Sequence, residues 1–344
     1  MAEGLVVSIV VLNYNGKEYL ERYFESLLKI NYPNTELILV DNGSTDGSVE
    51  FMREKFPSVI IVTTGKNLGC GGGFNAGMQQ AKGDILVNLA NDTAVHPEFA
   101  NELVKIFQSD KKIGACVCKI LHPDGKILDS AGDYLTISGF LFHRGNEEAD
   151  HGQFDRVEDL FAGKGTAIAF KASVLREVGM FDSDMFVFFE DADLCWRIHL
   201  AGYRIVFVPQ SIVYHYFGGV LGKTPKAMND YHAFKNRILS LIKNLSFSRL
   251  FLVLLLHIMF CLGVVGFYFI KRNFQNGFAI LRAISWNFSH LPYIWKKRRE
   301  VQYKIRKVPN REFMPRVQKK FDSFYFLRLL NNYCGSWTRF WKAT

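Results

Sequence analysis

Three carboxylates lie within four positions of the stretch FFEDADLCWR, residues 188–197. Glu190 and Asp191 are adjacent, directly after two phenylalanines, and Asp193 follows two positions later. Apolar surroundings and neighbouring like charges both raise the pKa of a carboxyl group, because both disfavour its ionised form. A carboxylate of that kind is suited to act as a general base near neutral pH. The alternative is that acidic residues favour the first turn of a helix through its dipole, which accounts for Asp193 alone.

Four more polar or glycine-rich segments each follow an apolar run that predicts a strand. The predicted strands are residues 5–12, 36–40, 59–64 and 84–90, and the segments after them are residues 13–16, 41–48, 67–73 and 91–92. Helical spacing of apolar residues between these runs predicts βαβ units and a mostly parallel, Rossmann-like sheet flanked by helices. Ligands bind beyond the carboxyl ends of such strands. We therefore expect one site where these segments converge.

The glycines between residues 69 and 73 have more than one interpretation. Gly71, Gly73 and Ala76 fit the G-x-G-x-x-A pattern of dinucleotide-binding folds, which would make the chain an oxidoreductase. The pattern follows the third predicted strand rather than the first, which weakens this reading. Close approach of the backbone to a ligand, or a tight turn, accounts for the glycines equally well.

Five motifs occur in an order that resembles glycosyltransferase family 2, in its rhamnosyltransferase-like branch. They are VSIVVLNYNG, LILVDNGSTDGS, NLGCGGGFNAG, ILVNLANDT and FVFFEDADLCWRIHLAGYRIVFVP, and the resemblance covers roughly residues 5–240. It implies a GT-A fold of the α/β class. It also implies an inverting hexosyltransferase that takes a sugar from a nucleotide-sugar.

The resemblance also implies roles for individual residues. The donor would be bound by Asn13, Asn15, Asp41, Asn67, Gly69, Asn91 and Arg237, with Asp41 accepting a hydrogen bond from a pyrimidine ring. Asp92 matches the last residue of the family's D-x-D motif, which binds a divalent metal such as Mg²⁺ or Mn²⁺ at the donor diphosphate. Here the motif reads Ala90-Asn91-Asp92, so its first carboxylate is missing.

His215, Asp191 and Glu190 complete the expected site. His215 stands where relatives have a histidine near the donor phosphates or the metal, although a buried core histidine is the alternative. Glu190 and Asp191 match the family's acidic pair, whose aspartate is taken as the base that deprotonates the acceptor hydroxyl. For Arg237 the alternative is a solvated charge on a helix.

The charge distribution divides the chain. Residues 271–344 carry 17 Lys and Arg against three Asp and Glu, a net charge of +14, whereas residues 1–270 have a net charge of −5. Residues 250–270 contain no formal charge, and as a helix they would be about 31 Å long, close to the hydrocarbon thickness of a bilayer. We therefore expect the basic tail to meet an anionic membrane surface rather than nucleic acid.

The expected organisation is a catalytic domain over residues 1–240 and a basic, membrane-associated helical region over residues 241–344. Within the first, residues 1–120 would bind the nucleotide-sugar and residues 121–240 the acceptor. A lone span by residues 250–270 would carry the basic tail away from the cytosolic donor, against the positive-inside tendency. We therefore expect residues 250–295 to lie at the cytoplasmic face of the membrane, with residues 250–270 re-entrant or shallow.

The function expected from the sequence is transfer of a sugar to a lipid-linked saccharide acceptor in cell-surface polysaccharide synthesis. Rhamnose from dTDP-rhamnose is the favoured donor. The alternative from another class is a catalytically degenerate protein that only binds its ligand and docks to the membrane. The incomplete D-x-D motif favours that alternative, and the intact EDADLCWR stretch argues against it.

Overall fold

The computed structural model describes residues 4–217 and 224–319, so the last part of the basic tail lies outside the described residues. The chain forms two compact units. The first comprises Met1–Tyr134, His143–Lys223 and Ile305–Val317, and the second comprises Leu135–Phe142, Thr224–Lys304 and Gln318–Thr344. The boundary expected at residue 240 falls inside helix α9 (Lys226–Asn244).

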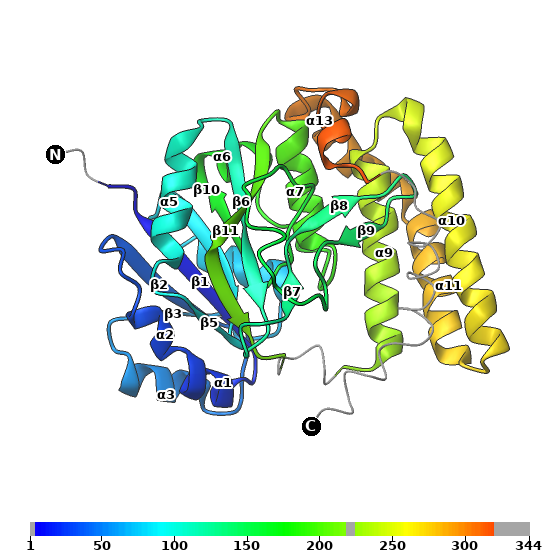
Figure 1. The fold of residues 1–344 in the computed structure, drawn as a ribbon. Coiled ribbons are helices and arrows are strands. Elements are labelled where there is room, and N and C mark those ends of the chain that lie inside the picture. Colours follow the sequence, from blue (N-terminus) through cyan, green and yellow to red (C-terminus); the bar gives the residue numbers. More distant parts are fainter. Residues whose placement is uncertain (1–3, 218–223, 320–344) are drawn as a thin grey trace. The chain divides into compact units, whose positions relative to one another are not determined.

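The first unit is built on a nine-stranded sheet (Figure 1). The strand order is β3-β2-β1-β4-β10-β6-β11-β5, with β7 beside β6. The bounds are β1 (Val7–Asn13), β2 (Thr35–Asp41), β3 (Ile60–Thr63), β4 (Ile85–Ala90), β5 (Thr93–Val95), β6 (Ile113–Leu121), β7 (Leu128–Ser130), β10 (Ala167–Lys171) and β11 (Arg204–His215). The pairs within β3-β2-β1-β4 and the pair β6-β11 are parallel, while β10 runs antiparallel to both of its neighbours. The expected mostly parallel sheet is confirmed, and β8 (Asp133–Leu135) and β9 (Leu141–His143) form a small separate sheet.

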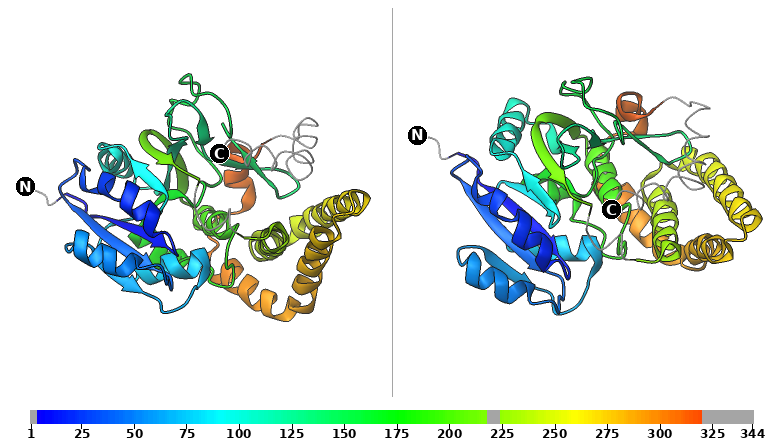
Figure 2. Two further views of the ribbon diagram at one scale, coloured as in Figure 1. Left: turned by 90° about the horizontal axis from the view of Figure 1, so that it is seen from below. Right: turned by 60° about the horizontal axis from the view of Figure 1, so that its bottom comes forward.

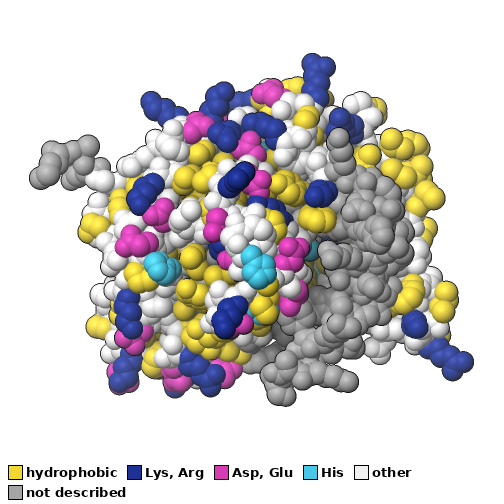
Figure 3. Space-filling model, in the orientation of Figure 1, with side chains coloured by type: hydrophobic (Ala, Val, Ile, Leu, Met, Phe, Trp, Pro, Cys, Tyr) yellow, Lys and Arg dark blue, Asp and Glu magenta, His cyan; other side chains and the backbone are white. Residues whose placement is uncertain are grey.

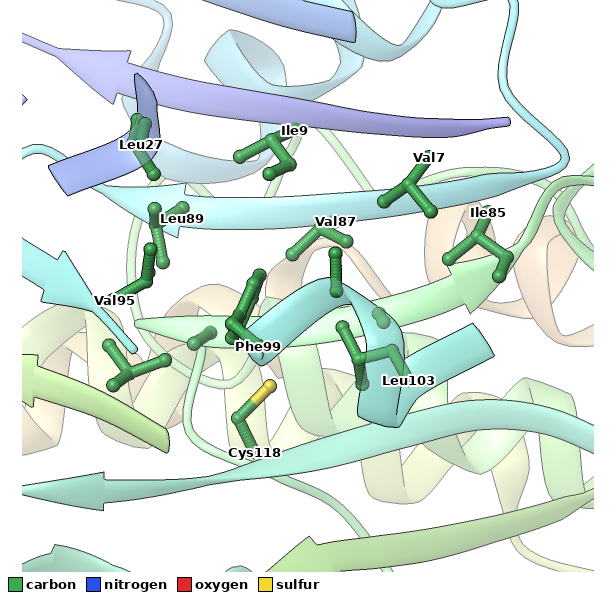
Figure 4. Packing of buried hydrophobic residues seen from close by; sticks show 14 of the residues in the cluster. Val7, Ile9, Leu27, Ile85, Val87, Leu89, Val95, Phe99, Leu103 and Cys118 are labelled. Carbon is green, nitrogen blue, oxygen red and sulfur yellow. The ribbon is translucent and has the colours of Figure 1, made fainter. Parts of the chain in front are cut away.

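Helices cover both faces of the large sheet (Figure 2). They are α1 (Lys17–Tyr23), α2 (Glu25–Leu28), α3 (Ser48–Lys55), α4 (Gly69–Met78), α5 (Phe99–Ser109), α6 (Ala172–Val178) and α7 (Glu190–Leu200), with α13 (Asn310–Val317) near the end of the described chain. Successive residues of a strand point to opposite faces of the sheet. Val7 and Ile9 of β1 accordingly pack in the cluster that contains Phe99 and Leu103 of α5 (Figure 4), while Val10 faces α4.

The glycine-rich segment is a helix rather than the expected loop. The sequence predicted a helix over residues 74–81, but α4 begins at Gly69. A Cβ atom on Gly73 would overlap Leu12, and one on Gly77 would overlap Val10 and Val40. The glycines therefore let α4 pack directly on β1 and β2, and this packing overrides their low helix propensity.

Strand β6 was missed in the sequence. All nine of its residues, IGACVCKIL, are buried, so it is a continuous apolar run of the same kind as residues 5–12. The stretch between β6 and β10 is largely polar with weak periodicity, and its strands are the three-residue β7, β8 and β9. Its irregular appearance in the sequence matches this structure.

The second unit is helical. It contains α9, α10 (Phe247–Ile270), α11 (Phe274–Ser289) and α12 (Leu291–Glu300), followed by the π-helical turn η1 (Val301–Ile305). Helix α9 contacts the other three helices, and α10 also packs along α11. Buried side chains from α9, α10 and α11 form its core, with Phe140 from the short segment Leu135–Phe142.

Candidate donor and catalytic site

The carboxyl ends of neighbouring strands bring the polar segments together in the first unit. Asn13 at the end of β1 is the register partner of Asp41 at the end of β2. On the other side of β1, Leu12 pairs with Ala90 of β4, which places Asn91 just beyond the sheet. The Asn91 amide donates to Oδ1 of Asn13 at 2.6 Å. The segments that follow β1, β2 and β4 therefore meet at one edge, as the sequence predicted.

Asp41 has an oxygen that no residue of the described chain satisfies. Its side chain is buried, and Oδ2 accepts a hydrogen bond from the backbone N–H of Ser44 at 3.1 Å. Oδ1 is also buried, but it has no hydrogen-bond partner within the described residues. Because buried acceptors are almost always paired, an unpaired one next to a ligand edge suits a donor N–H group of that ligand.

Asn15 and Asn67 shape the loops in which they lie. The side-chain oxygen of Asn15 accepts the N–H of Thr45 at 2.8 Å, which ties the loop after β1 to the loop after β2. The side-chain oxygen of Asn67 accepts the N–H of Gly69 at 2.8 Å and an amide N–H of Asn42 at 3.1 Å. Both side chains thus hold loop geometry, and direct contact with a donor stays a prediction for them.

Gly69 packs against the backbone of Phe186, in the segment that precedes α7, and leaves no room for a side chain. Its φ is +74°, a region that favours glycine, and a Cβ atom there would overlap the carbonyl of Phe186. The N–H of the next residue, Cys70, donates to that same carbonyl at 2.7 Å. The glycines of α4 therefore face protein atoms, not the open space that a dinucleotide pyrophosphate needs. Their packing removes the basis for the oxidoreductase interpretation.

A strained turn presents the acidic pair. Phe188 and Phe189 have φ values of 67° and 69°, and left-handed backbone is uncommon for bulky residues. Such strain persists only where the surrounding structure enforces it, and it gathers at functional sites. The turn begins α7 at Glu190, so that Glu190 and Asp191 lie in its first turn.

Backbone N–H groups hold both oxygens of Asp191. Oδ2 accepts the N–H of Gly165 at 2.7 Å, and Oδ1 accepts the N–H of Ala192 at 2.7 Å. Burial raises the pKa of Asp191 above the usual aspartate range in spite of these bonds. Burial and the charge of Asp191 together raise the pKa of Glu190 well above its usual value, and Glu190 Oε2 has no partner in the described part of the chain. Two carboxyl groups with raised pKa values are a feature of acid–base sites.

Asp193, the third carboxylate of the stretch, holds the helix. Its side chain is fully buried, and its Oδ2 accepts a hydrogen bond from Nε of Arg197 at 3.1 Å. Arg197 in turn donates to the carbonyls of Val178 and Met180. The ring of Trp196 is also fully buried. Of the three crowded carboxylates, Asp193 therefore belongs to the core, while the catalytic roles expected for Glu190 and Asp191 stay predictions.

Asp92 and His215 form a close pair. Nε2 of His215 lies 3.4 Å from Oδ1 of Asp92, and both side chains are buried. His215 is the last residue of β11, whose end pairs with β5 just after Asp92. Burial by itself lowers the pKa of His215, but its contacts with Asp129 and Asp92 raise that pKa above the usual value.

These two side chains suit a metal ion whose coordination shell is completed by the phosphates of a bound nucleotide. No group of three or more His, Cys, Asp or Glu side chains among residues 4–217 and 224–319 is arranged to hold a metal ion. One carboxylate oxygen and one imidazole nitrogen nevertheless suit a divalent cation whose remaining ligands come from water and phosphate, as is usual for Mg²⁺. The pair fits a metal that binds together with the donor diphosphate.

Asp129 on β7 is a site residue that the sequence did not reveal. Its carboxylate accepts hydrogen bonds from Lys164 Nζ at 2.6 and 2.7 Å and lies 2.9 Å from Nδ1 of His215. Lys164 and His215 hold the pKa of Asp129 well below its usual range, although burial alone would raise it. A single aspartate in an irregular stretch carries no signal, because only the tertiary fold brings the Asp129 side chain to His215 at the end of β11.

Arg237 lies on α9 in the second unit. Its guanidinium carbon lies 4.4 Å from the ring centre of Phe140 and 5.4 Å from that of Phe234, both in the same unit. These aromatic contacts show that it is not a simple solvated charge. Its expected contact with the donor stays a prediction.

Known proteins similar to this chain agree with the fold. A family model described as Glycosyl transferase family 2 matches residues 8–179, half of the chain. The N-acetylglucosaminyl-diphospho-decaprenol L-rhamnosyltransferase of Mycobacterium tuberculosis is 29% identical over 243 residues, covering 64% of this chain and 79% of the relative.

Two solved structures share the GT-A architecture. The structure of GalNAc-T7 with UDP, GalNAc and Mn²⁺ is similar with a TM-score of 0.56 and 19% identity, covering 71% of this chain and 48% of that one. A mannosyltransferase from Pyrobaculum calidifontis in complex with GDP-Man and Mn²⁺ has a TM-score of 0.53 and 17% identity, covering 96% and 88%. With the family match over half of its length, this chain belongs to glycosyl transferase family 2 and is a glycosyltransferase.

Proposed function

We propose that the protein transfers a sugar, with inversion at the anomeric carbon, from a nucleotide-sugar to a lipid-linked saccharide during surface polysaccharide synthesis. The observation that carries this proposal is the half-buried Asp191, whose two carboxylate oxygens are held by backbone N–H groups beside the buried Glu190. Rhamnose from dTDP-rhamnose is the favoured donor. The similarity to the N-acetylglucosaminyl-diphospho-decaprenol L-rhamnosyltransferase of Mycobacterium tuberculosis supports both the sugar and the acceptor class.

Donor binding is assigned to the edge where β1, β2 and β4 end. The unpaired Oδ1 of Asp41 would accept the ring N–H of thymine or uracil, which supplies the donor that this buried oxygen lacks. Asn13 and Asn91, joined by their hydrogen bond, would line the same edge. Asn15, Asn67 and Gly69 would hold the loops around the nucleotide.

Asp191 is assigned the role of general base. Its carboxylate would take the proton from the acceptor hydroxyl while that oxygen bonds to the anomeric carbon. The bond from the anomeric carbon to the nucleoside diphosphate breaks on the opposite face, so the configuration inverts. The N–H groups of Gly165 and Ala192 each engage one oxygen of Asp191, and each oxygen keeps a lone pair for the proton. Burial and the charge of Asp191 raise the pKa of Glu190, which favours a neutral carboxyl group beside the base.

A divalent metal, Mg²⁺ or Mn²⁺, is assigned to Asp92 and His215. When bound it would supply positive charge that stabilises the departing diphosphate. The Mn²⁺ ions in the two similar solved structures support the presence of a divalent metal. The residues of this chain contribute one carboxylate oxygen and one imidazole nitrogen at 3.4 Å from each other, so the diphosphate itself must complete the shell.

The second unit is assigned to the membrane surface. Within the described residues, α10 is the one helix long and apolar enough to cross a bilayer. One side of α10 packs inside the unit, and the other presents a continuous apolar stripe. The stripe comprises Phe247, Phe251, Leu252, Leu255, Leu256, Met259, Leu262 and Ile270, and apolar side chains of α10 are visible in Figure 3. Exposed apolar patches of this extent mark interaction surfaces.

The contacts of α10 favour a helix that lies in the membrane plane. His257, near its middle, is fully buried, and its Nδ1 donates to the carbonyl of Ser138 at 2.8 Å. If α10 spanned the bilayer, this polar contact and the segment carrying Ser138 would lie in hydrocarbon, which is costly. In the plane, only the apolar stripe is immersed. Residues 247–300 contain eight Lys and Arg against one acidic residue, which suits the anionic head groups of a cytoplasmic leaflet.

Thermal shift with a panel of donors tests the proposed function. The panel contains dTDP-rhamnose, UDP-N-acetylglucosamine, GDP-mannose and NADH, each with and without Mn²⁺. A ligand at 100 times its Kd stabilises the folded state by about 2.7 kcal/mol, so binding at that level is easily seen. We expect a Mn²⁺-dependent shift with dTDP-rhamnose, followed by transfer of labelled rhamnose to a prenyl-diphospho-N-acetylglucosamine. A shift with NADH alone, or donor binding without any transfer, would contradict the proposal.

A further inference from the structure

The hydrogen bonds of Asp129 define a buried network that the proposed roles of Asp92 and His215 leave unexplained. Its side chain is only 1% exposed and has three polar contacts: two with Lys164 Nζ and one with His215 Nδ1. An ion pair on the surface would be an ordinary feature. A buried carboxylate is costly unless its oxygens are paired, and both oxygens of Asp129 have polar partners, which fix its position. Its location beside His215 points to a function for that ring.

The contact with Asp129 determines which nitrogen of His215 carries the proton. An ionised carboxylate only accepts hydrogen bonds, so Nδ1 of His215 must donate to Asp129 at 2.9 Å. Nε2 then faces Oδ1 of Asp92 at 3.4 Å, which is longer than an ordinary N–H···O hydrogen bond. When the ring is neutral, Nε2 and Oδ1 are two acceptors at a separation that suits a shared cation. Histidine ligands of metals commonly donate their other N–H to a carboxylate in this way.

We propose that Asp129, anchored by Lys164, is a positioning residue that holds His215 as the Nδ1–H tautomer, so that its Nε2 and Asp92 face one divalent metal ion. The Ala90-Asn91-Asp92 motif lacks one of the family's two carboxylates. Asp129 does not replace it as a metal ligand, but it supports metal binding indirectly by orienting His215. The inference rests on the metal-binding role of Asp92 and His215 in the proposed function.

Lys164 explains why Asp129 is not itself a ligand. Its ammonium group contacts both oxygens of Asp129, at 2.6 and 2.7 Å, so a metal ion would have to displace it. The next residue, Gly165, donates its N–H to Asp191 and accepts a hydrogen bond from the Asn88 amide on its carbonyl. Residues 164 and 165 therefore connect Asp129 and His215 to the proposed base Asp191. This connection fixes the position of His215 relative to Asp191.

Metal binding by Asp129→Asn tests the inference. The probe is Mn²⁺ titrated in the presence of dTDP, with free Mn²⁺ measured by electron paramagnetic resonance. Loss of an outer-shell partner typically weakens metal affinity 10- to 100-fold, and we expect a loss of about that size. The matched control is Asp159→Asn, which removes the ion pairs of Asp159 with Arg204 and Arg316 in the same unit but no contact of His215. Equal Mn²⁺ affinity in Asp129→Asn and wild type would overturn the proposal.

A second measurement needs no variant and no nucleotide. Histidine-selective ¹⁵N NMR of the metal-free protein at pH 8 reports the tautomer of each ring, and His215→Gln identifies its signal. We expect His215 to be the Nδ1–H tautomer, and an Nε2–H tautomer would overturn the proposal even if Asp129→Asn fails to fold. If the protein binds no nucleotide-sugar, the proposed function fails, while the tautomer still tests the role of Asp129. Lys164→Arg should keep the tautomer, and Lys164→Met should weaken Mn²⁺ binding in the dTDP titration.

Discussion

The backbone N–H of Gly165 donates a 2.7 Å hydrogen bond to Oδ2 of Asp191, a residue 26 positions later in the chain. A Cβ atom on Gly165 would lie 3.0 Å from that oxygen, which is a tight contact, so a glycine favours the approach. Because a backbone group holds the carboxylate, its position depends on the sheet rather than on a flexible side chain. This rigidity suits a base that must meet an acceptor hydroxyl in one geometry.

Replacing Asp191 with Asn should abolish transfer and leave donor binding largely intact. The substitution removes the base with almost no change in volume, and loss of a general base costs roughly 100- to 10,000-fold in rate. Turnover on the acceptor and the thermal shift with donor are measured side by side. Asp124→Asn, in an exposed turn, is the control. Near-normal turnover by Asp191→Asn would show that the carboxylate is not the base.

The raised pKa of Asp191 predicts both a rate profile and a stability difference. The base must be ionised, so the rate should fall in acid with an apparent pKa above the usual value of about 3.9. A raised folded-state pKa also means that ionisation destabilises the fold as pH rises from the unfolded to the folded value. Asp191→Asn should therefore have a Tm at least equal to that of wild type at pH 8, with the difference vanishing near pH 3. A lower Tm at pH 8 would contradict the predicted direction of the shift.

Asp92→Ala and Asp41→Ala should differ in their metal dependence. Asp92 is assigned to the metal, so its loss should weaken binding of a nucleoside diphosphate in Mn²⁺ and have little effect in EDTA. Asp41 is assigned to the base of the nucleotide, so its loss should weaken binding in both conditions. Calorimetry on both variants with dTDP measures this. If the dTDP affinities of both variants depend on Mn²⁺ in the same way, the assignment of Asp92 to the diphosphate end and Asp41 to the base end of the donor is wrong.

Asp193→Ala should destabilise the fold without a specific effect on catalysis. It leaves Arg197 buried without its carboxylate, and breaking one side of a buried ion pair typically costs 3–5 kcal/mol. Chemical denaturation measures the change, and kcat per folded molecule should stay within a few-fold of wild type. Glu177→Ala is the control, because its ion pair with Lys307 is exposed on the Lys307 side. A loss of less than about 1 kcal/mol would show that the pair is not structural.

The apolar stripe of α10 predicts membrane binding that depends on single exposed side chains. Leu252 and Met259 are 60% and 61% exposed, so Leu252→Glu with Met259→Glu should fold normally. Sedimentation with vesicles that contain anionic lipid should show weaker binding of this double variant than of wild type. Leu28→Glu is the control, since Leu28 is 51% exposed in the first unit.

Labelling of a C-terminal tag in intact cells decides whether α10 lies in the membrane plane or spans the bilayer. With α10 in the plane, a tag placed after Thr344 stays on the cytosolic side and resists reagents added outside the inner membrane. Modification of that tag from outside would show that α10 crosses the bilayer.

Local sequence determined the parts of the fold that depend on short-range patterns. The apolar run of residues 5–12 predicted β1, and the polar residues after it predicted its carboxyl end, because burial on both faces requires such a run. The parallel order then placed Asn13 beside Asp41 without any knowledge of contacts. The acidic pair Glu190–Asp191 was likewise visible in the sequence, and so was the basic, apolar C-terminal part.

Tertiary packing alone decided the rest. The glycines at the start of α4 predict a loop by propensity, yet they form a helix because β1, β2 and Phe186 approach too closely for any side chain. The sequence explained Asp193 by the preference of acidic residues for the first turn of a helix, but only the fold shows that it is buried against Arg197. Asp129 and Lys164 are 35 positions apart, and neither carries a local signal. Their contact with each other and with His215 exists only because the sheet places β7 near the end of β11, and long-range pairing of this kind leaves no pattern in the sequence.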